Sequence, residues 1–144
     1  MTRNGTILLV EDNQDDIELT LVAFENSHLP VNIVVKRDGE EALHYLFDAV
    51  DRHDPDALPE VVLLDLKLPR VNGLEVLRRL RADERTRRLP VVILTSSSEE
   101  RDVVNSYEFG ANSFVRKPVD FTEFIEAARQ LGLYWLVYNE PPSR

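Results

Sequence analysis

The chain of 144 residues has 26 acidic and 17 basic side chains, a formal charge of −9, and no cysteine. This length fits one domain with a sizeable core, the lack of cysteine excludes disulfides and thiolate chemistry, and the acidic balance argues against a nucleic-acid partner. No apolar run approaches the ~18 residues of a membrane span and the N-terminus shows no secretory signal, so we expect a cytoplasmic protein without a membrane partner.

Five short apolar segments rich in β-branched residues are predicted to be strands. Their almost continuous apolar character is typical of parallel strands that are covered on both faces. They are residues 6–11, 31–37, 60–65, 90–95 and 112–116.

Segments with helical spacing of apolar residues alternate with these strands. In chain order they are the segment around Ile17, Leu21 and Phe24, residues 39–50, the segment around Leu74, Leu77 and Leu80, residues 98–109, closed by Gly110, and a helix after an N-cap at Asp120. Five strand–helix units in succession predict an α/β fold with a doubly wound, five-stranded parallel sheet and right-handed crossovers.

These units form one predicted domain over residues 1–133, with a surface loop at residues 51–59. Six arginines between Arg78 and Arg88 predict a solvated helix face and loop. Residues 134–144 form a tail that begins with Tyr134-Trp135-Leu136-Val137-Tyr138 and is too short to be an output domain.

Polar side chains follow the apolar strands where ligands bind in such sheets, at the carboxyl ends. Glu11 and Asp12 follow the first strand, Asp65 ends the third, Thr95 ends the fourth, and Lys117 follows the fifth. Clustered carboxylates need a cation or a shifted protonation state, and hard oxygen ligands suit Mg²⁺. A carboxylate beside Mg²⁺ can attack phosphorus, while an ammonium and a hydroxyl neutralise the phosphoryl oxygens.

Four motifs give this pattern a family resemblance. They are Leu8-Leu9-Val10-Glu11-Asp12-Asn13, Leu63-Leu64-Asp65-Leu66-Lys67-Leu68-Pro69 with Gly73, Leu94-Thr95-Ser96, and Val115-Arg116-Lys117-Pro118. Over residues 5–133 the chain resembles the receiver domain of two-component response regulators, the CheY-like fold.

Within that family, the chain is similar to the stand-alone regulators that partner bacterial phytochrome kinases. The features behind this narrower resemblance are Glu11-Asp12-Asn13-Gln14-Asp15-Asp16, Tyr45-Leu46, Lys117-Pro118-Val119-Asp120 and Tyr134-Trp135-Leu136.

The resemblance implies a role for each matching residue. It makes Asp65 the phosphoacceptor, Thr95 and Lys117 the partners of the phosphoryl group, and Phe114 the switch aromatic. It places Mg²⁺ on Glu11, Asp12, Asp65 and the backbone carbonyl of Lys67, and it implies a cis peptide bond before Pro118. Because Phe114 stands where the family more often has tyrosine, the switch residue lacks a hydroxyl here.

We therefore expect a phosphoacceptor switch, not a classical enzyme, although it would catalyse its own phosphorylation and dephosphorylation. The donor would be a sensor histidine kinase, of the phytochrome type on the narrower resemblance, and the output an unidentified protein. Two alternatives remain open from the sequence: a receiver-like scaffold that works without phosphorylation, and an autonomous phosphatase.

We also expect a homodimer built on the fourth helix, the fifth strand, the fifth helix and the tail. Six apolar or aromatic residues in a row, from Leu133 to Tyr138, exceed what a short exposed tail should carry. The alternative is that these residues fold back on their own domain as a last helical turn.

Overall fold

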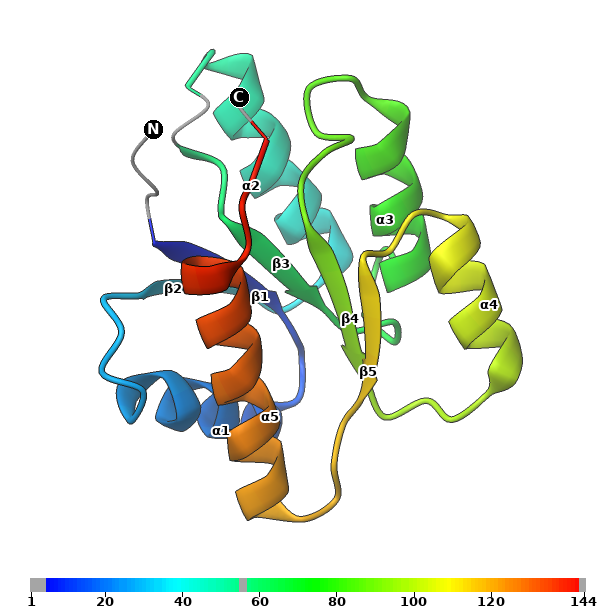
Figure 1. Cartoon of the computed structure of the whole chain (residues 1–144). Helices are drawn as coiled ribbons and strands as arrows, with labels where there is room; N and C mark the ends of the chain where they lie inside the picture. The colour runs from blue at the N-terminus through cyan, green and yellow to red at the C-terminus, as the bar shows by residue number, and fades with distance from the viewer. Residues whose placement is uncertain (1–4, 55–56, 143–144) are drawn as a thin grey trace.

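The computed structural model describes residues 5–54 and 57–142, so Pro55 and Asp56 of the predicted loop, the first four residues and the end of the tail lie outside it. All strands pair in parallel in one sheet of order β2-β1-β3-β4-β5 (Figure 1). The strands are β1 (Thr6–Val10), β2 (Asn32–Lys36), β3 (Val61–Leu64), β4 (Val91–Thr95) and β5 (Ser113–Arg116). Each predicted strand is confirmed, one or two residues shorter than expected.

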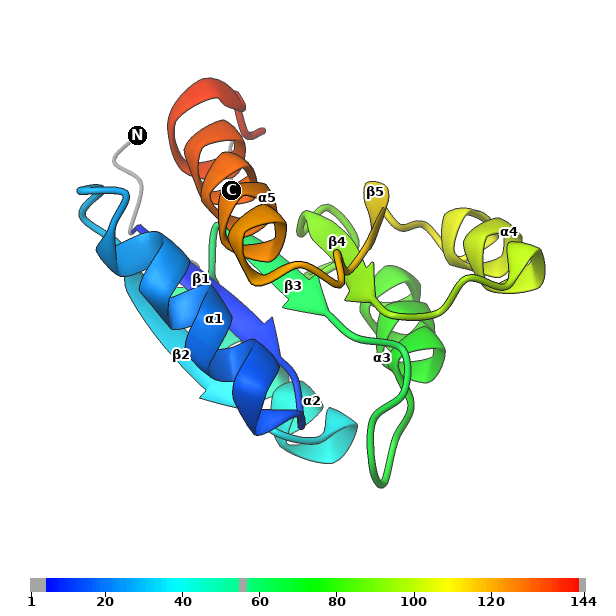
Figure 2. The same ribbon diagram turned by 90° about the horizontal axis from the view of Figure 1, so that it is seen from below.

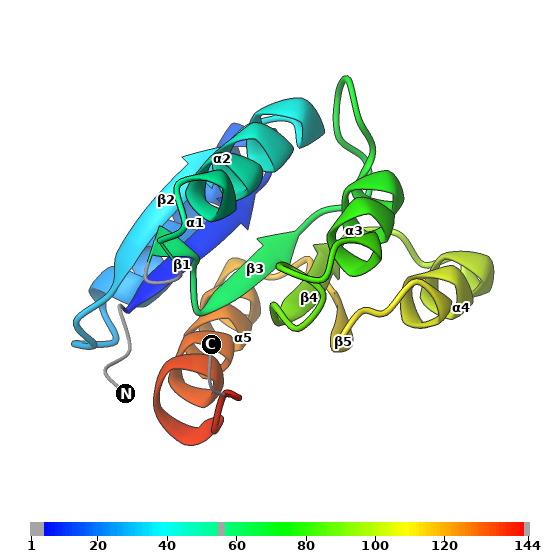
Figure 3. The same cartoon turned by 90° about the horizontal axis from the view of Figure 1, so that it is seen from above.

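Helices cover both faces of the sheet, which confirms the doubly wound fold. α1 and α5 lie on one face, and α2, α3 and α4 lie on the other (Figures 2 and 3). The helices are α1 (Gln14–Glu25), α2 (Gly39–Asp51), α3 (Gly73–Ala82), α4 (Glu100–Glu108) and α5 (Phe121–Leu133), which continues into a π-helix, η2 (Tyr134–Tyr138).

Side-chain caps explain where four of the helices begin. Asn13, Asp38, Asn72 and Asp120 each accept a hydrogen bond from the backbone N–H three residues further on. α4 has no such side-chain cap and begins at Glu100, two residues later than predicted. Its end is as expected, because Gly110 has a φ of +100°.

The alternation of side chains along the strands builds one core on each face of the sheet. Leu8, Val10 and Ile93 lie in the α2–α3 core, whereas Ile7, Leu9 and Val92 lie in the α1–α5 core. α1 and α5 approach closely at Gly132, where an added Cβ would stand 2.1 Å from the ring of the buried Phe24. Only glycine fits this contact without moving the ring.

The arginine-rich stretch is solvated only in part. Arg78, Arg79 and Arg85 form ion pairs with nearby acidic residues at the surface. The prediction was wrong for Arg81, whose guanidinium donates to the carbonyls of Gly110 at 2.9 Å and Leu89 at 2.8 Å. Its long side chain thereby ties α3 to the loop before β4 and to the turn between α4 and β5.

The tail folds back on the domain for only part of its apolar run. Trp135 and Leu136 pack against the α1–α5 core, as the fold-back alternative expected. Tyr134 and Val137 remain 50% exposed and Tyr138 71% exposed. No helix within residues 5–54 and 57–142 is long and apolar enough to cross a membrane.

Candidate functional site

The predicted polar residues meet at the carboxyl edge of the sheet, which faces the viewer in Figure 2. Backbone hydrogen bonds extend the strand ladder to these residues: the N–H of Asp65 donates to Val10 and the N–H of Lys117 donates to Thr95. The side chains are therefore placed by the rigid sheet.

The Lys117 ammonium lies among three carboxylates. Its Nζ is 2.7 Å from Glu11 Oε1, 2.8 Å from Asp16 Oδ2 and 3.1 Å from Asp65 Oδ2. The side chains of Lys117, Glu11 and Asp65 are 7%, 3% and 8% exposed. Little water reaches these charges, so each depends on the others for stabilisation.

Burial and neighbouring charges shift the pKa values of this cluster. Burial raises the pKa of Glu11 to about 7, repulsion by Asp65 adds to the rise, and hydrogen bonds from Lys117 and from the N–H of Asn13 oppose it. Burial alone would lower the pKa of Lys117, but Asp16, Glu11 and Asp65 together raise it. The ammonium therefore stays charged, whereas the Glu11 carboxyl loses its proton only near neutral pH.

Three of the carboxylates could hold a metal ion. Glu11, Asp12 and Asp65 each offer one oxygen, and these oxygens lie within 4.8 Å of one another. Hard oxygen donors with an exposed member at the rim suit a divalent cation that keeps several waters. The N–H of Lys67 lies 3.4 Å from Asp65 Oδ1, while the metal-binding role of the Lys67 carbonyl stays a prediction.

The β3–α3 connection brings backbone close to Asp65. The N–H of Gly73 donates to the carbonyl of Leu66 at 2.8 Å. A Cβ on Gly73 would stand 2.2 Å from the Asp65 carbonyl oxygen. Glycine here lets the start of α3 pack directly on the strand end that carries the candidate phosphoacceptor.

Thr95 and Phe114 lie on the same face of the sheet. Phe114 pairs in register with Ile93, two residues before Thr95, and packs half-buried against the α2–α3 core. Thr95 is fully buried, and its hydroxyl accepts a hydrogen bond of 3.4 Å from the N–H of Ser97. The predicted hydroxyl and switch aromatic therefore belong to neighbouring strands.

Asp16 is the site residue that reasoning from strand ends missed. It sits in the first turn of α1, where the Asn13 cap holds its backbone N–H at 3.0 Å. Asp16 does not follow a strand, so the ends of the strands could not reveal it. An acidic residue in the first turn of the helix after β1 is a usable signal, because that helix begins at the carboxyl edge of the sheet.

The cis peptide bond implied before Pro118 is not found. No peptide bond in the described part of the chain is cis, including the one that joins Lys117 to Pro118. The trans form is the intrinsically favoured one even before proline.

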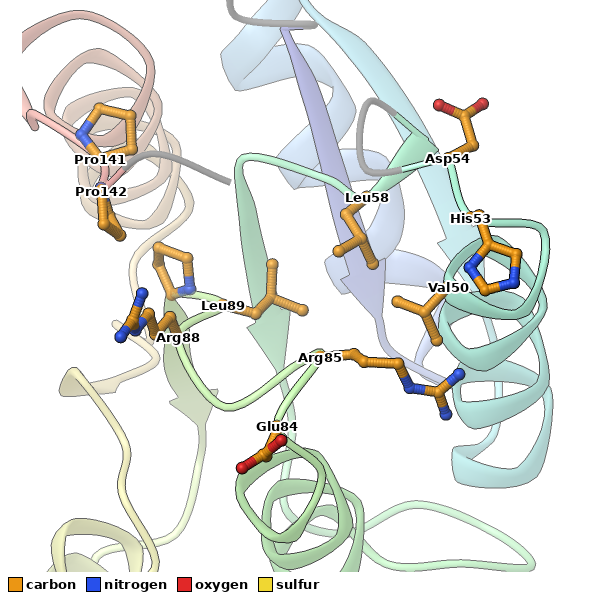
Figure 4. A pocket seen from close by; sticks show the side chains of 11 residues that line it. Val50, His53, Asp54, Leu58, Glu84, Arg85, Arg88, Leu89, Pro141 and Pro142 are labelled. Carbon is orange, nitrogen blue, oxygen red and sulfur yellow. The ribbon is translucent and has the colours of Figure 1, made fainter.

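A separate hollow of about 430 Å³ opens at the opposite edge of the sheet (Figure 4). Its floor includes Val50, Leu58 and Leu89, and Pro141 and Pro142 of the tail line its side. None of the predicted site residues lines this hollow.

The sequence model of the response regulator receiver domain family matches residues 7–129 of this chain. The chain therefore belongs to this family. FilR2 of Methanothrix harundinacea, a probable methanogenesis regulatory protein, is 40% identical over 137 residues, which cover 95% of this chain and 87% of that protein. Response regulator Rcp1 of Synechocystis sp. is 32% identical over 130 residues, or 90% of this chain and 88% of that protein.

Solved structures support the narrower resemblance to phytochrome regulators. The Mn²⁺-bound form of Rcp1 has a TM-score of 0.87 at 31% identity and covers 96% of this chain and 99% of that chain. The phosphorylated cyanobacterial phytochrome response regulator RcpA has a TM-score of 0.86 at 35% identity with the same coverage. The bacteriophytochrome response regulator AtBRR is 53% identical, with a TM-score of 0.69, over 94% of this chain and 97% of that chain.

Replacing Lys117 by methionine is expected to destabilise the metal-free protein by about 3–5 kcal/mol, because Glu11 and Asp65 would lose the buried ammonium between them. Urea unfolding at neutral pH measures this change, with Lys67→Met, at an exposed lysine, as the matched control. A loss below about 1 kcal/mol, the range of a surface ion pair, would contradict the account of the cluster.

Proposed function

We propose that the protein is a single-domain response regulator that accepts a phosphoryl group on Asp65 and signals through protein contacts that depend on phosphorylation. The donor is a sensor histidine kinase of the phytochrome type, and the exchange takes place in the cytoplasm. The observation that carries the proposal is the Lys117 ammonium 3.1 Å from Asp65 Oδ2, beside carboxylates that suit a divalent cation.

In the proposed transfer, a carboxylate oxygen of Asp65 attacks the phosphorus of a phosphohistidine. A phosphorus–oxygen bond forms, the phosphorus–nitrogen bond breaks, and the imidazole nitrogen keeps the electron pair. Lys117 donates to the transferring phosphoryl oxygens, and the Thr95 hydroxyl adds a second donor. Glu11, Asp12, Asp65 and the carbonyl of Lys67 would hold Mg²⁺, which when bound would neutralise charge at the same oxygens.

The solved relatives support both the proposed phosphoryl transfer at a divalent cation and the proposed phytochrome kinase. Rcp1 has been solved with Mn²⁺ and RcpA in a phosphorylated form, which fits a divalent cation and an acyl phosphate at this edge. The phytochrome partner rests on the names of RcpA and AtBRR together with the sequence motifs.

Asp65→Asn is expected to abolish phosphorylation by acetyl phosphate or a phosphohistidine donor, because the amide keeps the shape but is not a nucleophile. Intact-mass measurement counts the added phosphoryl group. Labelling should require Mg²⁺ and weaken strongly in Asp12→Ala, which removes one of the proposed metal ligands, an exposed carboxylate.

Unchanged labelling of Asp65→Asn would contradict the assignment of the phosphoacceptor. A wild-type protein that takes up no phosphoryl group under any donor, yet binds its partner, would instead favour the scaffold alternative.

We further propose that Thr95 and Phe114 transmit the phosphorylated state. A hydroxyl that turns toward a new dianion gains a charge-assisted hydrogen bond, and its movement makes room for the neighbouring aromatic ring. Binding of a phosphoryl mimic is expected to shift the amide NMR resonances of α4 and β5. Shifts confined to the loops around Asp65 would count against this route.

A homodimer through α4, β5, α5 and the tail is the proposed means of pairing with a dimeric kinase. Apolar side chains remain exposed along this surface: Val104, Tyr107 and Phe109 near α4, and Tyr134, Val137 and Tyr138 in the tail. A two-fold contact would let one such patch serve both copies.

Sedimentation tests the dimer with residues that have no core role. Val137→Ala combined with Tyr138→Ala is expected to convert a wild-type dimer at tens of micromolar to monomer without loss of thermal stability, because both side chains are at least half exposed. Leu21→Ala, at an exposed apolar position on α1, is the control and should leave the dimer intact. A monomeric wild type, with and without a phosphoryl mimic, would refute the dimer.

A further inference from the structure

Asp16 holds Lys117 from outside the metal-binding group. Among the described residues, Glu11 and Asp65 contact Lys117 and also belong to the group of oxygens suited to a metal ion. Asp16 contacts the ammonium at 2.8 Å but is not part of that group. Its carboxylate therefore acts on the site through the lysine.

The backbone of Asp16 is fixed on both sides. Its N–H donates to Asn13 Oδ1 at 3.0 Å, and its carbonyl accepts from the Thr20 hydroxyl at 2.8 Å. The side chain is only 23% exposed. The carboxylate is thus positioned by the first turn of α1 and is not a free surface group.

The donors of Lys117 are fully used in this arrangement. An ammonium has three N–H groups, and three carboxylate oxygens lie within 3.1 Å of Nζ. A phosphoryl group on Asp65 brings a further strong acceptor with additional negative charge. Glu11 is committed to the metal-binding group and Asp65 carries the phosphoryl group, so Asp16 is the partner that Lys117 can release.

We propose that Asp16 competes with the phosphoryl group for the Lys117 ammonium and thereby biases the protein toward its unphosphorylated state. This inference rests on the proposed function and concerns the regulation of the same site. Asp16 is a positioning residue, because it is argued to act through Lys117 and not on the reacting atoms.

Beryllium fluoride at saturating Mg²⁺ is the probe, because its beryllium coordinates the carboxylate oxygen reversibly. It therefore reports the equilibrium between the free and the occupied carboxylate without transfer of a phosphoryl group. Asp16→Asn is expected to bind it roughly threefold or more tightly than the wild type, because an amide is a weaker acceptor for Lys117 and the repelling charge is gone. Titration followed by ¹⁹F NMR measures the affinity.

Asp15→Asn is the matched control. Asp15 lies in the same helical turn and is exposed, so the same change of charge away from Lys117 should alter the affinity by less than about twofold. Asp16→Glu keeps the charge, and its affinity is expected to stay close to that of the wild type. Thermal unfolding of each variant verifies that it is folded.

The NMR resonance of the Lys117 ammonium distinguishes the proposed role of Asp16 from a purely structural one, which would leave this resonance unchanged. The ¹⁵Nζ resonance is expected to change in Asp16→Asn before the probe is added, and to change less than in the wild type when the probe binds. Equal or weaker binding by folded Asp16→Asn would overturn the inference. A wild type that does not bind the probe at all would instead overturn the proposed function.

Discussion

The arrangement at the carboxyl edge depends on one buried ammonium placed among carboxylates that repel one another. Lys117 contacts Glu11, Asp16 and Asp65 at 2.7–3.1 Å in surroundings that water hardly reaches. Such a cluster gains little net stability from its own ion pairs, because the charges lose their hydration. In the mechanism proposed above, its value is that the ammonium exchanges one carboxylate partner for another when the charge at Asp65 changes.

The sheet fixes the backbone of Glu11, Asp65 and Lys117, and the start of α1 fixes that of Asp16, so the proposed exchange involves side chains alone. β1, β3 and β5 end at the same edge, and their ladders extend to Asp65 and Lys117. Gly73 lets α3 pack on the backbone of Asp65, and Asn13 caps the turn that carries Asp16. The proposed switch therefore needs only side chains to move when Asp65 changes. Thr95 and Phe114, its proposed transmitting residues, lie on one face of the sheet in neighbouring strands.

Much of this arrangement follows from local patterns in the sequence. Buried parallel strands require continuous apolar runs, so their ends, and with them Glu11, Asp65, Thr95 and Lys117, can be read from the sequence. Helix starts follow where a capping side chain is present, as at Asp120, and shift where it is absent, as at α4.

Contacts between distant segments could not be predicted in the same way. Arg81 looks like its solvated neighbours in the sequence, yet it donates to the carbonyl of Leu89, before β4, and to that of Gly110, before β5. Asp16 pairs with a lysine 101 residues away. The tail divides into packed and exposed residues according to where the α1–α5 core lies, which an apolar run alone does not reveal.

The most direct test of this account is the structure of the protein bound to Mg²⁺ and beryllium fluoride. The account predicts that Lys117 Nζ lies within hydrogen-bonding distance of a fluorine on Asp65 and has released Asp16. A structure in which Nζ still contacts Asp16 and makes no contact with the group on Asp65 would contradict it.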